Sequence, residues 1–309
     1  MLVRNPPVEI TDNLWMLGIN EYPLYLVRGS GEAALFEGGV GAMGPLVLEQ
    51  LEKLGIEPDA IRRQIVPHAH PDHVMAVPLF QRTFPDLAVI ASQPAAGTLS
   101  VEKAISFFTQ IDEAITVSLM KMGRITEAHR PQPLEEKRIS VDRVVKEGDT
   151  IAVDGFSFHV LETPGHSDCS LSFHEPGKGI LLISDAAGYY MPEHDAWWPD
   201  YFTGYAAYLA TLERLLALDA EILCLGHHGV FRGADAVRSH LGRSISATRE
   251  YHERIVAEAN SGKPVRQIAE QLGSEVHEKT PLLPVEFFQK NCGLLVKESL
   301  GYEGISIDK

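Results

Sequence analysis

The sequence carries little positive charge for its length. Its 309 residues include 27 Lys and Arg against 42 Asp and Glu, which gives a formal net charge of −15 at pH 7. Proteins that bind a nucleic-acid backbone rely on clustered lysine and arginine, so this balance argues against nucleic acid as a substrate. The sequence also lacks an apolar run that could span a membrane and an N-terminal apolar signal segment. We therefore expect a cytoplasmic protein that acts on a small molecule.

Cysteine is scarce as well. The three cysteines, Cys169, Cys224 and Cys292, are far apart, odd in number and not arranged in Cys-x-x-Cys pairs. This pattern excludes a disulfide scaffold and is typical of reduced thiols in the core of a cytoplasmic protein. No repeat or low-complexity segment is visible, and the length allows one large domain or two.

Strand and helix patterns alternate along most of the chain, which predicts a layered α/β fold. Two stretches depart from this alternation. Residues 93–137 have helical apolar spacing and are interpreted as an insertion, either a surface helical pair or a wall over a site. Everything after about residue 234 is predicted to be helical. We therefore expect a catalytic domain over 1–233 and a helical C-terminal cap over 234–309.

The hexad His68-Ala69-His70-Pro71-Asp72-His73 is the densest group of metal-binding side chain types in the chain. It follows a predicted strand at Ile65-Val66. Because side chains of an extended segment repeat every second residue, His68 and His70 can point the same way. Asp72 and His73 can then reach a second point nearby. Neutral imidazole and carboxylate are protein ligands of zinc, iron and manganese, so this hexad could serve two metal ions. The alternative is a solvated histidine-rich loop.

Three further residues lie where a predicted strand gives way to a loop. His166 follows one such strand in a Gly-His pair, Asp185 follows another, and His227 follows a third in Gly226-His227-His228-Gly229. Ligand sites of layered α/β proteins tend to lie off strand ends. We therefore expect these residues to join the hexad, with His228 as an alternative ligand in the last motif.

The ordered motifs His-x-His-x-Asp-His, Gly-His, Asp and Gly-His resemble the metallo-β-lactamase superfamily over roughly residues 10–230. The resemblance implies an α/β fold, the αβ/βα four-layer sandwich of two mixed sheets with helices outside, here with a helical C-terminal appendage. It also implies a binuclear metal centre and favours His227 over His228. The implied ligands are His68, His70 and His166 for the first ion, Asp72, His73 and His227 for the second, and Asp185 between the two.

This resemblance implies a hydrolase with two divalent metal ions, zinc as first choice and iron or manganese as alternatives. Two cations lower the pKa of a bridging water from 15.7 towards ~7 and polarise a carbonyl group. Asp72 and Asp185 are the expected catalytic carboxylates. Glu37 stands where the superfamily usually carries an acidic residue at a strand end. We interpret it as a group that orients a ligand histidine, with a plain capping carboxylate as the alternative.

Within the superfamily, the chain resembles the thioesterase branch, which includes glyoxalase II and the quinolone-signal response protein PqsE. The similar segments are Trp15–Gly18, Phe36–Gly39, the helix Tyr208–Leu215 and the final helices; Pro67 departs from the usual threonine. This resemblance implies an acyl thioester substrate. Open alternatives are lactone or phosphodiester hydrolysis, iron-dependent oxygen or persulfide chemistry, and a signalling protein with incidental catalysis.

We expect an aromatic-rich loop after Asp185, and it is the best local indication of what binds. We expect some of its rings to line an apolar acyl pocket beside the metal ions, although a hydrophobic minicore is the alternative. The apolar C-terminal helices could also supply a homodimer surface. The candidate pocket residues are Tyr189, Tyr190, Trp197 and Trp198.

Overall fold

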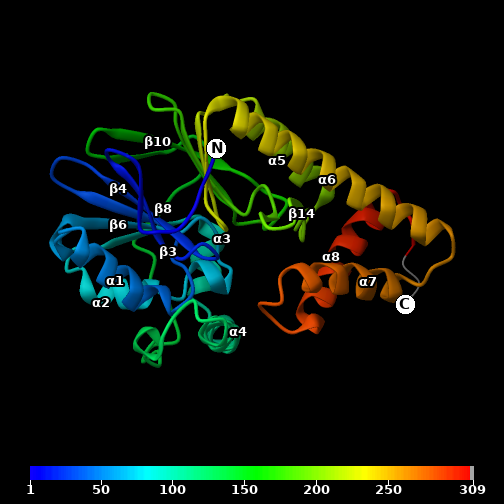
Figure 1. Cartoon of the computed structure of the whole chain (residues 1–309), viewed down its shortest axis with the longest axis horizontal. Helices are drawn as coiled ribbons and strands as arrows, with labels where there is room; N and C mark the ends of the chain where they lie inside the picture. Colours follow the sequence, from blue (N-terminus) through cyan, green and yellow to red (C-terminus); the bar gives the residue numbers. More distant parts are fainter. Residues whose placement is uncertain (307–309) are drawn as a thin grey trace.

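Two seven-stranded sheets form the centre of the protein (Figure 1). The computed structural model describes residues 1–306. In one sheet the order is β2 (Val8–Thr11), β3 (Leu14–Gly18), β4 (Pro23–Arg28), β5 (Ala33–Phe36), β6 (Ile61–Ile65), β7 (Ala88–Ala91) and β8 (Arg143–Val144). In the other it is β1 (Leu2–Val3), β16 (Val230–Arg232), β15 (Ile222–Leu225), β12 (Ile180–Ser184), β11 (Leu171–Glu175), β10 (Phe156–Glu162) and β9 (Thr150–Val153).

Both sheets are mixed. Strands β2 to β5 pair antiparallel, whereas β5, β6, β7 and β8 pair in parallel. Among the strand pairs of the second sheet within residues 1–306, only β12 and β15 are parallel. Parallel neighbours need a crossover connection, and helices α1 (Met43–Lys53) and α2 (Val77–Thr83) provide it between β5 and β7.

A hydrophobic core joins the two sheets face to face. Side chains alternate between the faces of a strand, so every second residue of each sheet enters this core. Phe36 of the first sheet packs on Phe158 and Phe173 of the second, with ring centroids 4.9 and 5.2 Å apart. Burial of a side chain of this size stabilises the fold by roughly 1.5–3 kcal/mol.

Helices cover the outer faces of both sheets. Val47 of α1 and Phe80 of α2 pack in one cluster with the outward-facing leucines of β3 to β5. Leu212 of α5 (Tyr205–Leu216) and Leu241 of α6 (Ala234–Asn260) pack with the outward side chains of β12 and β15. The layer order is helix, sheet, sheet, helix, which confirms the predicted αβ/βα sandwich.

The predicted insertion contains α3 (Gln93–Leu99) and α4 (Glu102–Lys121), followed by the 3₁₀ turn η3 (Glu127–His129). The helical pattern expected through residue 137 therefore ends early. Gly123 adopts φ 69°, a conformation that ends helices readily. Pro131 and Pro133 then follow, and proline cannot continue a helix. Shorter 3₁₀ turns, η1 (Pro58–Ala60) and η2 (Pro71–His73), flank β6.

After β16 the described chain is helical. The long helix α6 leads to a hairpin of α7 (Val265–Lys279) and α8 (Val285–Tyr302), which lies on the opposite side of the molecule from α1 and α2 (Figure 1). Within residues 1–306, none of the helices combines the length and hydropathy needed to cross a membrane. A two-stranded hairpin of β13 (Tyr189–Met191) and β14 (Ala196–Trp198) replaces the irregular loop expected after Asp185.

Candidate metal centre

Loops that follow strands of both sheets meet at one edge of the sandwich. The hexad follows β6 of the first sheet, whereas His166 follows β10, Asp185 follows β12 and His227 follows β15 of the second. The two sheets together therefore position the seven side chains that the sequence motifs picked out. Five of the seven are 5 % exposed or less, and the other two, His70 and Asp72, are half-buried.

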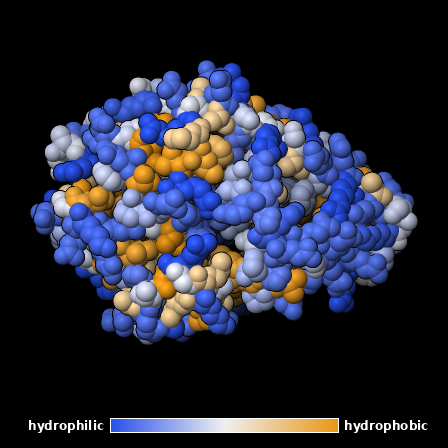
Figure 2. Space-filling view, viewed as in Figure 1, coloured by the Kyte–Doolittle hydropathy of each residue, from blue (hydrophilic) through white to orange (hydrophobic). Residues whose placement is uncertain are grey.

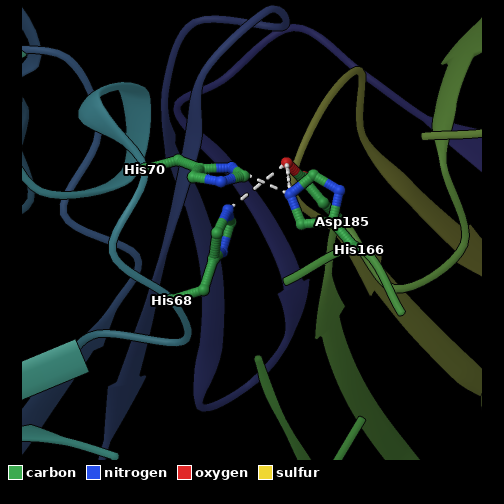
Figure 3. A group of neighbouring side chains, drawn as sticks. All are labelled: His68, His70, His166 and Asp185. Carbon is green, nitrogen blue, oxygen red and sulfur yellow. Dashed lines mark hydrogen bonds and ion pairs between the residues drawn. The ribbon is translucent and has the colours of Figure 1, made fainter. Parts of the chain in front are cut away.

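The seven side chains form two groups. His68, His70, His166 and Asp185 make one group, with their ligand atoms within 4.8 Å of one another. Figure 3 shows the three imidazoles of this group turned towards the carboxylate of Asp185. Asp72, His73 and His227 make the second group under the same distance limit. His228 belongs to neither; its ring packs edge-on against Tyr189, with the centroids 4.9 Å apart.

Asp185 lies between the two groups. Its Oδ2 atom is 3.6 Å from His68 Nε2, 3.5 Å from His166 Nε2 and 3.1 Å from His73 Nε2. Its Oδ1 atom is 3.4 Å from His227 Nε2. Ligands placed about 2.0–2.2 Å from one tetrahedral ion stand roughly 3.3–3.5 Å apart. The distances around Asp185, 3.1–3.6 Å, are therefore close to the spacing of donors around a shared cation.

Four of the five imidazoles are fixed through the nitrogen that faces away from the centre. The partners of the Nδ1 atoms are Ser184 Oγ for His68 at 3.2 Å, Glu37 Oε2 for His73 at 2.7 Å, Asp200 Oδ1 for His166 at 3.2 Å and the Glu21 carbonyl for His227 at 2.6 Å. Because a carboxylate or carbonyl oxygen can only accept, the last three Nδ1 atoms donate. Each of these three imidazoles therefore presents its Nε2 atom to the centre, where that of His166 lies 2.9 Å from His70 Nδ1. Such a hydrogen bond behind the ring is the usual support of metal-bound histidines.

Glu37 holds its position at a conformational cost. Its backbone φ is 73°, which is uncommon for a residue other than glycine. Its amide donates to the Ile65 carbonyl, and its own carbonyl accepts from the Gln64 side chain. At Gly38 a Cβ atom would lie 2.5 Å from the His73 carbonyl oxygen. The Glu-Gly pair thus brings the first sheet close enough to hold His73.

The protonation of the centre is set by burial and by its own carboxylates. Burial, with help from neighbouring His166, lowers the pKa of His70 to about 3, so this imidazole is neutral at pH 7. Burial also lowers the pKa of His73, but Asp185, Asp72 and Glu37 outweigh it and the pKa is raised. Although burial raises the pKa of Asp72, the neighbouring histidines His73 and His227 bring it down to about 2.

These residues fit a pair of divalent cations. Within the described part of the chain, the buried atoms His68 Nε2, His73 Nε2 and Asp185 Oδ1 have no hydrogen-bond partner. Buried polar atoms are normally paired, because an unpaired one costs about 1–3 kcal/mol. Among the described residues, the ion-pair partners of Asp72 and Asp185 are all histidines. Cations held between these atoms would satisfy both the orphaned nitrogens and the buried negative charge.

A cavity of about 420 Å³ opens onto the centre. His70, Asp72, His166, Asp185 and His227 form its floor together with Asp200. Its walls come from α4 of the insertion and from α8 with the segment before it. Both the insertion and the C-terminal helices therefore line the space above the centre.

The aromatic hairpin divides its rings between two sides. Tyr189 pairs with Trp198 across the β13–β14 ladder, and Tyr190 pairs with Trp197. Because cross-strand partners point to the same face and neighbours to opposite faces, only Tyr189 and Trp198 of these four line the cavity. Tyr190 and Trp197 pack instead against His240 of α6, with ring centroids 5.1 and 5.2 Å away. Of the four candidate pocket residues, Tyr189 and Trp198 thus lie at the cavity, and Tyr190 and Trp197 do not.

Two supporting residues were not anticipated from the sequence. Asp200 is buried beside His166 and accepts a hydrogen bond from the Tyr208 hydroxyl at 3.3 Å. Although burial lowers the pKa of His166, Asp200 and Asp185 outweigh it and raise this pKa to about 9. Ser184 is the other: its hydroxyl lies 3.2 Å from Nδ1 of His68. The sequence could have indicated Asp200 as an acidic residue within the aromatic-rich segment, whereas no pattern indicated Ser184.

Comparison with known proteins gives one family. Residues 23–227, about two thirds of the chain, match the family model described as Metallo-beta-lactamase superfamily. A metallo-beta-lactamase family protein from Thermus thermophilus has a similar structure, with a TM-score of 0.65 and 21 % sequence identity over 96 % of this chain and 95 % of that one. At this identity the likeness concerns the fold.

Curated relatives share the name hydroxyacylglutathione hydrolase. The protein of Xanthomonas campestris pv. campestris is 24 % identical over 254 residues, which are 81 % of this chain and 77 % of the relative. The protein of Legionella pneumophila (strain Corby) is 36 % identical over 53 residues, or 17 % of this chain. The chain spans only 21 % of the length of that relative, and 37 % of the length of one from Fuscovulum blasticum.

Proposed function

The chain belongs to the metallo-β-lactamase superfamily, and on that premise we propose that it is a metal-dependent hydrolase of ester-like bonds, with an acyl thioester as the first-choice substrate. The observation that carries the proposal is the position of Asp185 between two groups of imidazoles at the floor of a cavity. The name of the curated relatives, hydroxyacylglutathione hydrolase, supports a thioester over a lactone or a phosphodiester.

We propose that His68, His70 and His166 hold one divalent ion and that Asp72, His73 and His227 hold a second, with Asp185 shared by both. Five imidazoles and two carboxylates are a donor set suited to zinc, and also to iron or manganese. When bound, such ions lower the pKa of water towards neutrality and polarise a carbonyl group.

The chain's own residues would orient the reactants. Asp72 lines the cavity, its side chain is 24 % exposed, and its low pKa keeps it ionised at neutral pH. It can therefore accept a hydrogen bond from an attacking water and turn the lone pair of that water towards the substrate carbonyl. Tyr22 and Tyr189 pack against His227, with ring centroids 5.4 and 4.7 Å away, and both line the cavity beside it.

The test is hydrolysis of an uncharged acyl thioester by the purified, metal-loaded protein. The release of free thiol measures the rate. We expect His68→Ala to lower kcat/KM by about 10³-fold, since the loss of one ligand removes several kcal/mol of stabilisation of the transition state. His159→Ala is the matched control, because this histidine is exposed on β10 and lies outside the centre.

Three outcomes separate the proposal from its rivals. Hydrolysis that falls with His68→Ala and persists with His159→Ala supports it. Hydrolysis that is equal in both variants contradicts it. Thioesters left intact while oxygen is consumed with a persulfide substrate would assign the centre to redox chemistry and overturn the hydrolase proposal.

A further inference from the structure

Two helices from distant parts of the chain face each other across the cavity with hydrophobic side chains. On α4, Phe107, Phe108, Ile111 and Ile115 line the space. Their spacing places them on one face of the helix. On the other side, Phe287, Phe288 and Leu294 of α8, with Leu282 and Leu283 just before it, form the second wall.

The mouth of the cavity is apolar too. Phe107 is 56 % exposed and Leu294 is 37 % exposed, although both are large hydrophobic residues. Figure 2 shows hydrophobic residues gathered in the lower part of the view, over the position that α4 occupies in Figure 1. An apolar rim that continues into an apolar interior favours entry of an uncharged chain or ring over a charged group.

Among residues 1–306, those that line the cavity include no lysine or arginine. Their carboxylates are Asp72, Asp185 and Asp200, and their other polar side chains, apart from the histidines of the centre, are uncharged: Tyr22, Tyr189, Thr203, Thr280 and Asn291. Beyond the floor, where the proposed cations would lie, an anionic group on the substrate would therefore lose its hydration against the walls without gaining a cationic side chain as partner, which is unfavourable. The acidic composition of the whole chain acts in the same direction.

We infer that the cavity binds an uncharged, apolar acyl group, a medium-length alkyl chain or an aromatic ring, between α4 and α8, and that it makes no specific contact with an anionic carrier such as glutathione. This inference rests on the proposed hydrolase function and adds the class of substrate. It separates this chain from the curated relatives, whose name specifies an acylglutathione. The floor holds the reacting carbonyl, and the two helices select the group attached to it.

Acyl thioesters of N-acetylcysteamine, an uncharged thiol, provide the test. Each methylene group that the walls bury contributes roughly fourfold to binding. We therefore expect kcat/KM to rise by about 100-fold or more from the acetyl to the octanoyl thioester. S-lactoylglutathione should be hydrolysed more slowly than the octanoyl compound. Equal rates for acetyl and octanoyl, or a preference for the glutathione thioester, would overturn the inference while the hydrolase function stands.

A lysine introduced into the cavity wall tests whether the acyl group binds there. Ile111→Lys puts an ammonium group on the half-buried face of α4 that lines the cavity. We expect it to lower kcat/KM for the octanoyl thioester by about 10-fold or more, and to lower the acetyl value by a smaller factor. Ala114→Lys adds the same charge to an exposed position of the same helix, outside the lining, and should change neither. Equal effects of both variants on the octanoyl substrate would contradict the assignment.

A binding measurement makes the inference independent of catalysis. Metal-depleted protein should bind the neutral dye Nile red, and decanamide should displace it. Ile111→Lys should weaken both interactions by about 10-fold, and Ala114→Lys should leave them unchanged. Absence of hydrolysis with every thioester, together with normal decanamide binding, would count against the proposed function but not against the apolar site. Failure of the dye and the amide to bind would refute the site itself.

Discussion

The metal centre and the cavity wall above it are built in opposite ways. In the centre, four imidazoles are each held by a hydrogen bond or ion pair behind the ring, and they lie in loops that follow strands of both sheets. In the wall, hydrophobic side chains of α4 and α8 face the cavity without such polar contacts. From this difference we propose that the sandwich determines the reaction, whereas the two added helices select the substrate.

The largest effect should come from the residue that both metal groups share. Asp185→Asn keeps the size of the side chain but removes the negative charge between the two groups. We expect kcat/KM to fall by about 10³-fold or more for small and large acyl groups alike. Phe288→Ala, a wall variant, should reduce only the rate with large acyl groups. If Asp185→Asn instead changed the preference between acyl groups, the division between centre and wall would be wrong.

The contacts behind the imidazoles should have an intermediate effect. Glu37→Gln and Asp200→Asn each weaken the hold on one ligand histidine, His73 and His166 respectively. Loss of such a partner typically costs about 10–100-fold in metal affinity or activity. Metal affinity measured by competition with a chelator checks this, with Glu9→Gln at an exposed position of β2 as the control. Unchanged affinity in both variants would show that the imidazoles hold their orientation without these partners.

Packing within the C-terminal hairpin should affect stability by a smaller amount. At Gly273 of α7, a Cβ atom would lie 2.4 Å from the backbone nitrogen of Gln289 in α8. Gly273→Ala should therefore lower the free energy of unfolding by about 1–3 kcal/mol. At Gly293 of α8 the nearest atom would be 3.9 Å away, so Gly293→Ala should raise it by up to about 1 kcal/mol. Urea denaturation compares the two, and a destabilised Gly293→Ala would contradict the packing described.

The smallest expected effect concerns a buried acid on α4 that lies outside the cavity lining. Burial raises the pKa of Asp112 to about 7, although its carboxylate accepts a hydrogen bond from the Gly41 amide at 2.6 Å. A raised pKa means that the folded state binds the proton more tightly. The contribution of Asp112 to stability is therefore fully present below about pH 4 and is lost as the pH rises towards 7. In the Asp112→Asn variant, the free energy of unfolding should therefore fall by about 1–2 kcal/mol less over this pH range than in the wild type.

Thermal denaturation at pH 5 and pH 8 measures the effect of Asp112→Asn. The variant should gain stability relative to the wild type at the higher pH. Glu250→Gln, at an exposed position of α6, serves as the control. A wild type and an Asp112→Asn variant that respond equally to pH would show that this carboxylate does not titrate as described.

Much of the sandwich was predictable because its strands and helices have strong periodic patterns. The strand predicted before the hexad, the helix of Tyr208–Leu215 and the helices expected after about residue 234 lie where the sequence predicted them. The shorter strands β1 and β16 were not predicted, since two or three residues are too few for an alternation to appear. In the folded chain, β16 pairs with β15, and β1 in turn pairs with β16.

The site was predictable to the extent that spacing in the sequence carries it. The histidines and aspartates of the motifs lie together in the structure because each motif follows a strand of one of two packed sheets. Asp200 and Ser184 belong to no motif, and their roles depend on which side chain faces them after folding. Tyr189 and Tyr190 point to opposite sides because they are neighbours in the β13–β14 hairpin, and the sequence predicted a loop there.

A centre shared by two metal ions is tested most directly by the number of ions that the protein binds. Metal-depleted protein dialysed against zinc and analysed by mass spectrometry gives this number. We expect two equivalents for the wild type and for His159→Ala, and fewer than two for Asp185→Asn, because both groups share its carboxylate. A wild type that binds less than one equivalent, or an Asp185→Asn variant that binds two as tightly as the wild type, would contradict the shared centre.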